Sequence, residues 1–151
     1  MREIIKRLNY LIQAVPFRVN QFSEQEFSVR LLSEWSKKEI LGHLCDSATN
    51  NLHRFIKFQI EGQPLVVVPY NQNNWVLIQD YQGIPTCEIV DYWTTLNRQI
   101  VGVISKIPEE KLLYLCDIGD NKSITLAELI QDYLRHMEHH LRQIFFGTAD
   151  L

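Results

Sequence analysis

The sequence predicts an all-α protein: a four-helix bundle with a long crossover between its second and third helices. Three observations support this fold class. Apolar residues recur at helical spacing in four long segments, capping-box motifs mark the starts of two of them, and residues 62–85 show no helical period. The length of 151 residues fits a single domain that spans residues 1–151.

The first helix is expected over residues 3–15. Its apolar residues repeat every three or four positions and lie on one side: Ile4, Ile5, Leu8, Leu11 and Ile12. We expect Pro16 to end this helix, because proline lacks the backbone N–H that the next turn requires. A short helical segment is expected at residues 24–32.

The second helix has a clear start. Ser36 and Glu39 form a capping box, in which each side chain satisfies a free backbone donor near the other residue. The helix is expected to run to about Ile60, with Gly62 and Pro64 ending it.

Residues 62–85 are expected to form an extended crossover. The run of valines at 66–68 has the composition of a strand, but no second strand is evident, and an isolated strand leaves its backbone groups unsatisfied. A connection of this length lets the second and third helices run parallel. Long ordered connections are often functional.

The third helix is expected over residues 86–106, and a helical turn follows at residues 109–113. The apolar positions of the third helix are Ile89, Tyr92, Trp93, Leu96, Ile100 and Ile104. A second capping box, Thr125 with Glu128, opens the fourth helix. We expect this helix to reach about Phe146 and to end at Gly147.

The histidines are confined to two helices: His43 and His53 to the second, His136, His139 and His140 to the fourth. At about 100° per residue, the apolar residues of the fourth helix occupy an arc of roughly 140°: Leu126, Leu129, Ile130, Tyr133, Leu134, Met137, Leu141 and Ile144. His140 lies inside the edge of this arc and His136 lies just outside it. We therefore expect these two to face the bundle interior and His139 and His53 to be solvated.

His43 flanks the apolar arc of the second helix, and Ser47, Asn50 and Arg54 follow it along the same edge. This stripe is typical either of a solvated edge or of the wall of a binding site. A histidine at a core edge is often a packing residue, and two histidines one turn apart can bind a metal or arise by chance. The residues alone leave these alternatives open.

Two motifs carry a resemblance to a known family. Residues 42–47 read G-H-L-C-D-S, and residues 136–144 read H-M-E-H-H-L-R-Q-I. In this order and at this separation they resemble the DinB-like superfamily of metal-binding four-helix bundles, over essentially the whole chain. The resemblance implies that three histidines bind one divalent metal, and the matching residues are His43, His136 and His140.

The resemblance also bears on the acidic residues. Asp46 matches the family's aspartate after the first ligand. Asn73 and Asn74, in the segment 70–76, stand where the family often has acids before the tryptophan. This difference argues against a carboxylate base from the crossover.

Three imidazoles leave coordination positions open, as catalytic metal sites do. They suit Zn²⁺ or Ni²⁺, with Fe²⁺ as a further option. Such a metal can activate water to attack an ester or amide, or the sulfur of a low-molecular-weight thiol for transfer to an electrophile. Characterised relatives, which include bacillithiol S-transferases and a mycothiol-dependent isomerase, are similar to the second case. We expect a thiol S-transferase-like or hydrolase-like enzyme with a small-molecule substrate; the alternative is a non-catalytic metal or small-molecule binding protein linked to stress response.

Three further side chains have candidate roles. Asp46 would orient a metal ligand, or would be a surface carboxylate in mid-helix. Arg54 would hold an anionic group of a substrate. Trp75 would form a lid with the nearby asparagines, or would anchor the crossover as a buried residue.

Composition excludes several function classes. The net charge of -3 and the pI near 5.9 disfavour binding to nucleic acid, and no apolar stretch approaches the ~20 residues of a membrane span. Charges interrupt the N-terminal segment, so no signal peptide is expected. Cys45, Cys87 and Cys116 lie far apart without a CxxC pair, which is typical of buried or inert thiols in the cytoplasm. A homodimer is expected to use exposed aromatic residues: Tyr10, Tyr114, Phe145 and Phe146.

Overall fold

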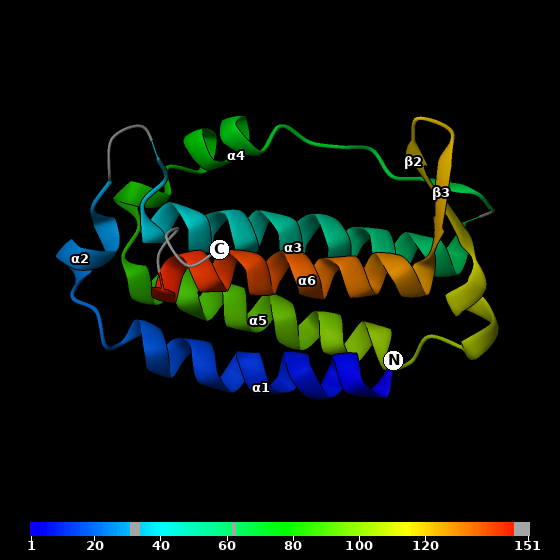
Figure 1. Cartoon of the computed structure of the whole chain (residues 1–151), viewed down its shortest axis with the longest axis horizontal. Helices are drawn as coiled ribbons and strands as arrows, with labels where there is room; N and C mark the ends of the chain where they lie inside the picture. Colours follow the sequence, from blue (N-terminus) through cyan, green and yellow to red (C-terminus); the bar gives the residue numbers. More distant parts are fainter. Residues whose placement is uncertain (31–33, 62, 147–151) are drawn as a thin grey trace.

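The computed structural model describes residues 1–30, 34–61 and 63–146, which form a bundle of four long helices (Figure 1). These helices are α1 (Arg2–Val19), α3 (Lys37–Ile60), α5 (Thr86–Ile104) and α6 (Leu126–Phe146). Helix α3 packs against both α5 and α6, whereas α1 packs mainly against α5. The predicted four-helix bundle is confirmed.

Helices α3 and α5 run parallel to each other, and α1 and α6 run in the opposite direction (Figure 1). The crossover returns along the outer side of α3 and makes this direction possible, as predicted. It is not wholly extended, because it contains α4 (Gln72–Gln79) and the short helix η1 (Tyr81–Gly83). Helix α4 was not predicted because Val76 is its one buried residue, so it has no apolar period.

A small sheet corrects the interpretation of the valine run. Strand β1 (Leu65–Val66) pairs in parallel with β2 (Leu115–Gly119), which pairs antiparallel with β3 (Lys122–Thr125). The partner strand lies about fifty residues further along the chain and is too short to show a period. Asp120 and Asn121 close the β2–β3 hairpin, both with positive φ, as a two-residue turn matching the strand twist requires.

Pro16 does not end the first helix, which continues to Val19. The missing N–H costs one helical hydrogen bond, but Val15 and Val19 continue the apolar spacing and are both buried. The short helix α2 (Glu24–Ser28) begins with a further capping box between Ser23 and Glu26.

The helix starts and apolar faces are otherwise as predicted. Both expected capping boxes form, at Ser36 with Glu39 and at Thr125 with Glu128. All eight residues of the predicted arc on α6 are buried, whereas Tyr92 of α5 is exposed and contacts Thr49. The expected roles of residues 31–32, Gly62 and Gly147 fall outside the described residues.

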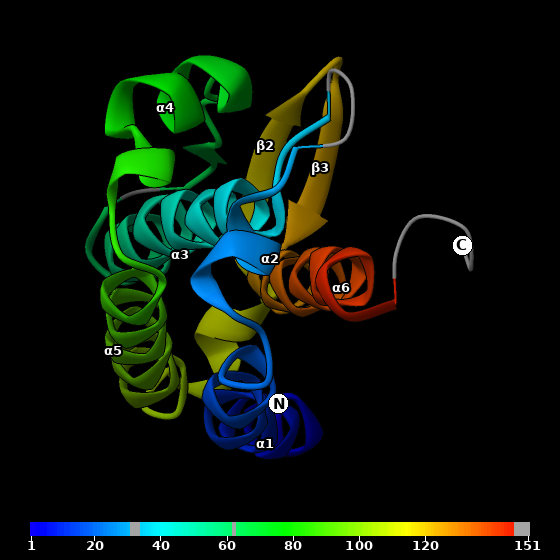
Figure 2. The ribbon, with the colours of Figure 1, turned by 90° about the vertical axis from the view of Figure 1, so that its left-hand side faces the viewer.

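Figure 2 shows α4 and the β2–β3 hairpin on the outer side of α3. The polar edge of α3 is therefore flanked by α6 and by the crossover. None of the described helices combines the length and apolar character that a membrane span needs.

Candidate metal centre

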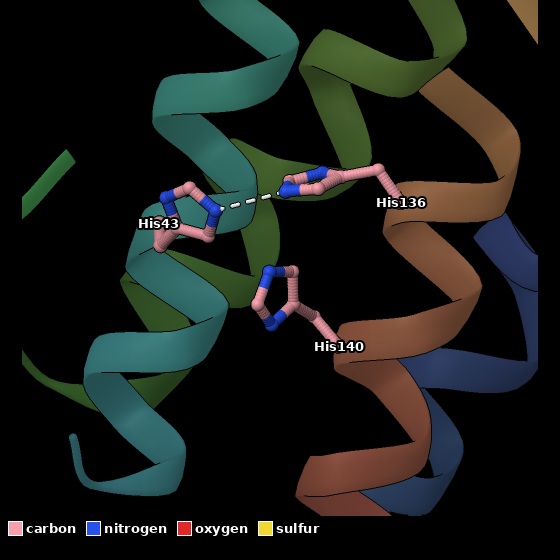
Figure 3. Close-up of side chains that lie close together, drawn as sticks. All are labelled: His43, His136 and His140. Carbon is pink, nitrogen blue, oxygen red and sulfur yellow. Dashed lines mark hydrogen bonds between the residues drawn. The ribbon is translucent and has the colours of Figure 1, made fainter. Parts of the chain in front are cut away.

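The packing of α3 against α6 brings three histidines together. His43 comes from α3, and His136 and His140 come from successive turns of α6 (Figure 3). One nitrogen of each ring lies within 4.8 Å of the other two. His43 is fully buried, whereas His136 and His140 are half-buried. His43 lies 93 residues before His136 and 97 before His140. They meet because the apolar arcs of α3 and α6 share one core.

The rings are arranged edge to face, and the centroid separations are between 4.6 and 5.0 Å. The Nε2 atoms of His43 and His136 are 3.1 Å apart. Two nitrogens bound to one tetrahedral zinc ion, each at about 2.0–2.1 Å, stand about 3.4 Å apart. The observed donor set and spacing therefore fit a single divalent ion.

The environment keeps these imidazoles neutral. Burial, together with the neighbouring histidines, lowers the pKa of His43 to about 3. Burial and His140 lower the pKa of His136 to about 4, and burial also lowers the pKa of His140. Neutral imidazole is the metal-binding form, so near neutral pH the three rings need not lose a proton to bind an ion.

Two of the rings have partners that orient them. The Nδ1 of His140 donates to Oε1 of Gln143 at 2.6 Å, so its Nε2 is free to face the other rings. The Nδ1 of His136 lies 3.4 Å from the Ser47 hydroxyl. The Nδ1 of His43 has no hydrogen-bond partner among the described residues, and its ring packs against Trp35.

The motif at residues 42–47 has a structural explanation. Gly42 lies under the ring of Tyr81, where a Cβ would come within 2.2 Å of the ring. The hydroxyl of Tyr81 donates to Oδ1 of Asp46 at 2.7 Å. Gly42 and Asp46, which precede and follow His43 on the helix, thus both contact Tyr81.

Asp46 is buried, so the alternative of a surface carboxylate is wrong. Its Oδ1 also accepts from Gln79 at 3.4 Å, and its Oδ2 has no partner among the described residues. Burial raises the pKa of this carboxyl, against the opposing effect of the Tyr81 hydrogen bond. Asp46 therefore faces the crossover and makes no hydrogen bond to the three histidines.

A cleft of about 180 Å³ reaches the cluster at His136. We call it the α3–α6 cleft; it is lined by Ser47, Asn51, Arg54, Tyr70, Gln72, Leu129, Asp132, Tyr133 and His136. Two of the residues from the predicted polar stripe, Ser47 and Arg54, lie in it. The third, Asn50, donates instead to the backbone carbonyl of Asp46.

Comparison with known proteins identifies the family. The sequence pattern of the DinB superfamily matches residues 7–144. The chain belongs to the DinB superfamily. A search of curated proteins found no significant match.

Solved structures share the DinB fold of this chain at low sequence identity. One of them is YfiT from Bacillus subtilis, which is described as a probable metal-dependent hydrolase with an unusual four-helix bundle topology. YfiT is 18% identical to this chain with a TM-score of 0.84, and the match covers 95% of this chain and 82% of YfiT. The mycothiol-dependent maleylpyruvate isomerase is 12% identical with a TM-score of 0.74 over 98% of this chain. This chain spans 61% of that isomerase. A histidine-to-alanine variant of the isomerase matches similarly, at 11% identity and a TM-score of 0.72, over 93% of this chain and 59% of the variant.

Several site residues of this DinB chain escaped the sequence analysis. Asn51 and Gln143 each lie one helical turn from a predicted site residue, and this spacing was the available signal. Tyr70 and Tyr81 come from the crossover, where no periodicity shows which side chains turn towards α3. Their position depends on long-range packing.

The other candidates from the crossover and the helices lie outside the cluster. Trp75 is half-buried against Tyr70, with ring centroids 5.1 Å apart, so it is not the deeply buried anchor of the crossover. Asn73 is exposed. His53 and His139 are exposed, as predicted.

The three cysteines are free thiols. Cys45 and Cys116 are buried, and burial raises the pKa of both, for Cys116 to about 12. Cys87 is exposed, so it is not one of the buried thiols, and that it is inert stays a prediction. The two buried thiols are held in the unreactive protonated form.

The aromatic residues expected at a dimer interface differ in exposure. Tyr10 and Phe146 are exposed, whereas Tyr114 and Phe145 are half-buried. Tyr10, Phe145 and Phe146 line a groove between α1 and α6. The homodimer stays a prediction.

Proposed function

We propose that this DinB chain is a metal-dependent enzyme that acts on a small molecule. The observation that carries the proposal is the convergence of three neutral imidazoles, from α3 and α6, beside a cleft that reaches His136. His43, His136 and His140 would hold one divalent ion, with Zn²⁺ or Ni²⁺ favoured by the all-nitrogen donor set and Fe²⁺ as a further option. Three protein ligands leave room for an exchangeable one.

The bound ion would supply a Lewis acid that lowers the pKa of a water or thiol at the open position. The chain's own residues do the rest. Gln143 fixes which nitrogen of His140 faces the centre. The cleft places a small molecule next to His136, with the neutral phenol of Tyr70 as a hydrogen-bond donor, because burial raises the pKa of Tyr70 to about 12.

Thiol S-transfer is the reaction class that we favour. The similarity to a mycothiol-dependent isomerase supports it, and a histidine-only centre is suited to a thiolate ligand. Hydrolysis is the second candidate, supported by the similarity to YfiT, described as a probable metal-dependent hydrolase. Asp46 would then be a positioning residue in either case, because it acts on the segment around His43 through Tyr81.

The proposal is tested by metal analysis of protein purified without chelators or nickel resin. We expect about one divalent ion per chain in the parent, and loss of the ion in His43→Ala. The control is His53→Ala, which removes an exposed histidine from the same helix and should keep the ion. Equal metal content in the two variants would refute the assignment of the centre.

Catalysis is tested separately from metal binding. The metal-loaded parent and both variants are assayed with low-molecular-weight thiols plus electrophiles, and with esters and amides. Turnover that is lost in His43→Ala and kept in His53→Ala supports an enzyme. Metal binding without any turnover across both panels would favour the alternative, a metal or small-molecule binding protein that is not a catalyst.

A further inference from the structure

The guanidinium of Arg54 is a half-buried cation whose contacts are neutral. Its Nη2 donates to the backbone carbonyl of Val68 at 2.8 Å, and its Nη1 lies 3.4 Å from Oδ1 of Asn51. No salt bridge to Arg54 occurs among the described residues. A guanidinium has five N–H donors and stays protonated even when buried, so this one keeps donors and a full charge for a ligand.

Arg54 and His136, one of the three clustered histidines, line the same cleft. Along its wall, the Nδ1 of His136 lies 3.4 Å from the Ser47 hydroxyl, and this hydroxyl accepts from Nδ2 of Asn51 at 3.4 Å. Asn51 in turn contacts Arg54. Ser47 and Arg54 are seven residues apart on α3, which is a rise of about 10 Å. The guanidinium reaches back from there to Asn51, so Ser47 and Asn51 separate it from His136.

The charges around the cleft favour an anion at this end. Asp132, the one acidic residue among those that line the cleft, is exposed and pairs with Arg135 at 2.8 Å. Tyr70 lines the same cleft and is a neutral donor whose phenol is close to both Ser47 and Arg54. The cation and the phenol together can donate to both oxygens of a carboxylate.

We propose that Arg54 binds a carboxylate at one end of an elongated substrate, while the reacting atom of that substrate lies at the three histidines. This inference rests on the proposed function and adds the substrate class: a small molecule with a carboxylate at one end and the reacting group, a thiol or a hydrolysable bond, at the other. The cleft volume of about 180 Å³ is below the usual range for drug-sized ligands, which fits a slender molecule.

The test uses octanoate and its neutral counterpart octanamide, which share a chain long enough to span the cleft. Each is titrated into the full chain without added metal and followed by NMR chemical shifts of the backbone amides. We expect octanoate to shift residues 51, 54 and 70 and to bind at least about tenfold more tightly than octanamide. Higher salt should weaken octanoate alone.

The variant Arg54→Gln should lower octanoate affinity at least about tenfold. Arg98→Gln removes the same charge from an exposed site on α5 and should change the affinity less than about twofold. Arg54→Lys keeps the charge without the planar fork and should fall between them. Thermal unfolding of each variant checks that the fold is retained.

Three outcomes would overturn the inference: equal octanoate affinity in Arg54→Gln and Arg98→Gln, equal affinity for octanamide, or shifts confined to the groove between α1 and α6. Metal content separates this result from the proposed function. If Arg54→Gln binds one ion per chain and octanoate binding does not depend on Arg54, the anion subsite alone is wrong. If the parent binds no ion, the proposed function fails whatever octanoate does.

Discussion

Gly42→Ala is the substitution that best tests how the fold supports the centre. An ideal Cβ at residue 42 would lie 2.2, 2.3 and 2.6 Å from three atoms of the Tyr81 ring. The ring cannot move away freely, because it is buried and its hydroxyl donates to Asp46. The extra methyl must displace either the ring or the helix beside His43.

The expected cost follows from that overlap. Overpacking a well-filled site costs about 1–3 kcal/mol, and helix propensity returns about 1 kcal/mol when alanine replaces glycine. With contacts this short we expect the upper part of the range, a net loss of about 2 kcal/mol in the free energy of unfolding. For a chain of this size, the melting temperature should then fall by about 4–8 °C.

The matched control is Gly102→Ala in α5. A Cβ there meets nothing within 4 Å, so the helix-propensity gain should raise stability by about 0.5–1 kcal/mol. Urea unfolding of the two variants and the parent measures both effects. If Gly42→Ala is as stable as Gly102→Ala, the close approach of Tyr81 to α3 is wrong.

Three further outcomes are expected. Tyr81→Phe and Asp46→Ala should each lower the free energy of unfolding by about 1–3 kcal/mol and weaken zinc binding by a similar factor, because both remove the hydrogen bond through which Asp46 acts on the segment around His43; weaker zinc binding in the Asp46 variant alone would contradict this route. Metal-free protein should lose stability as the pH falls from about 7 to 4. In the unfolded chain the histidines take up protons below their ordinary pKa, whereas in the folded chain His43 and His136 stay neutral down to about pH 3 and 4. Urea unfolding at several pH values tests this, and a free energy of unfolding that does not change with pH would contradict it. Chelation should leave a helical, cooperatively unfolding protein, because the core is apolar; loss of the circular-dichroism signal would show a structural metal.

The sequence predicted the parts of the site that depend on helical periodicity. The eight buried residues of α6 follow from the angle between successive residues, and the same angle turned His136 and His140 inward. Capping boxes fixed the starts of α3 and α6. Because both helices that carry the clustered histidines have strong local signals, their residues could be placed before any long-range contact was known.

The rest depends on contacts between distant segments. Strand β1 has two residues, and its pairing with Cys116 and Asp117 has no local signal. Tyr81 and Tyr70 reach α3 from a segment in which few residues are buried. Periodicity describes one element at a time, so it predicts the face that a helix buries and not the connection that covers its polar edge.

That connection has a physical role beyond topology. The three histidines that we propose as metal ligands lie on two long helices with a shared apolar core, which gives them fixed positions. The groups that line the cleft or contact α3 from outside come from the crossover: the phenol of Tyr70, the carbonyl of Val68 that holds Arg54, and the ring of Tyr81. Because these groups and the three histidines come from separate segments, substitutions in the crossover would change the contacts of Arg54 and Asp46 while the two helices still hold the histidines together.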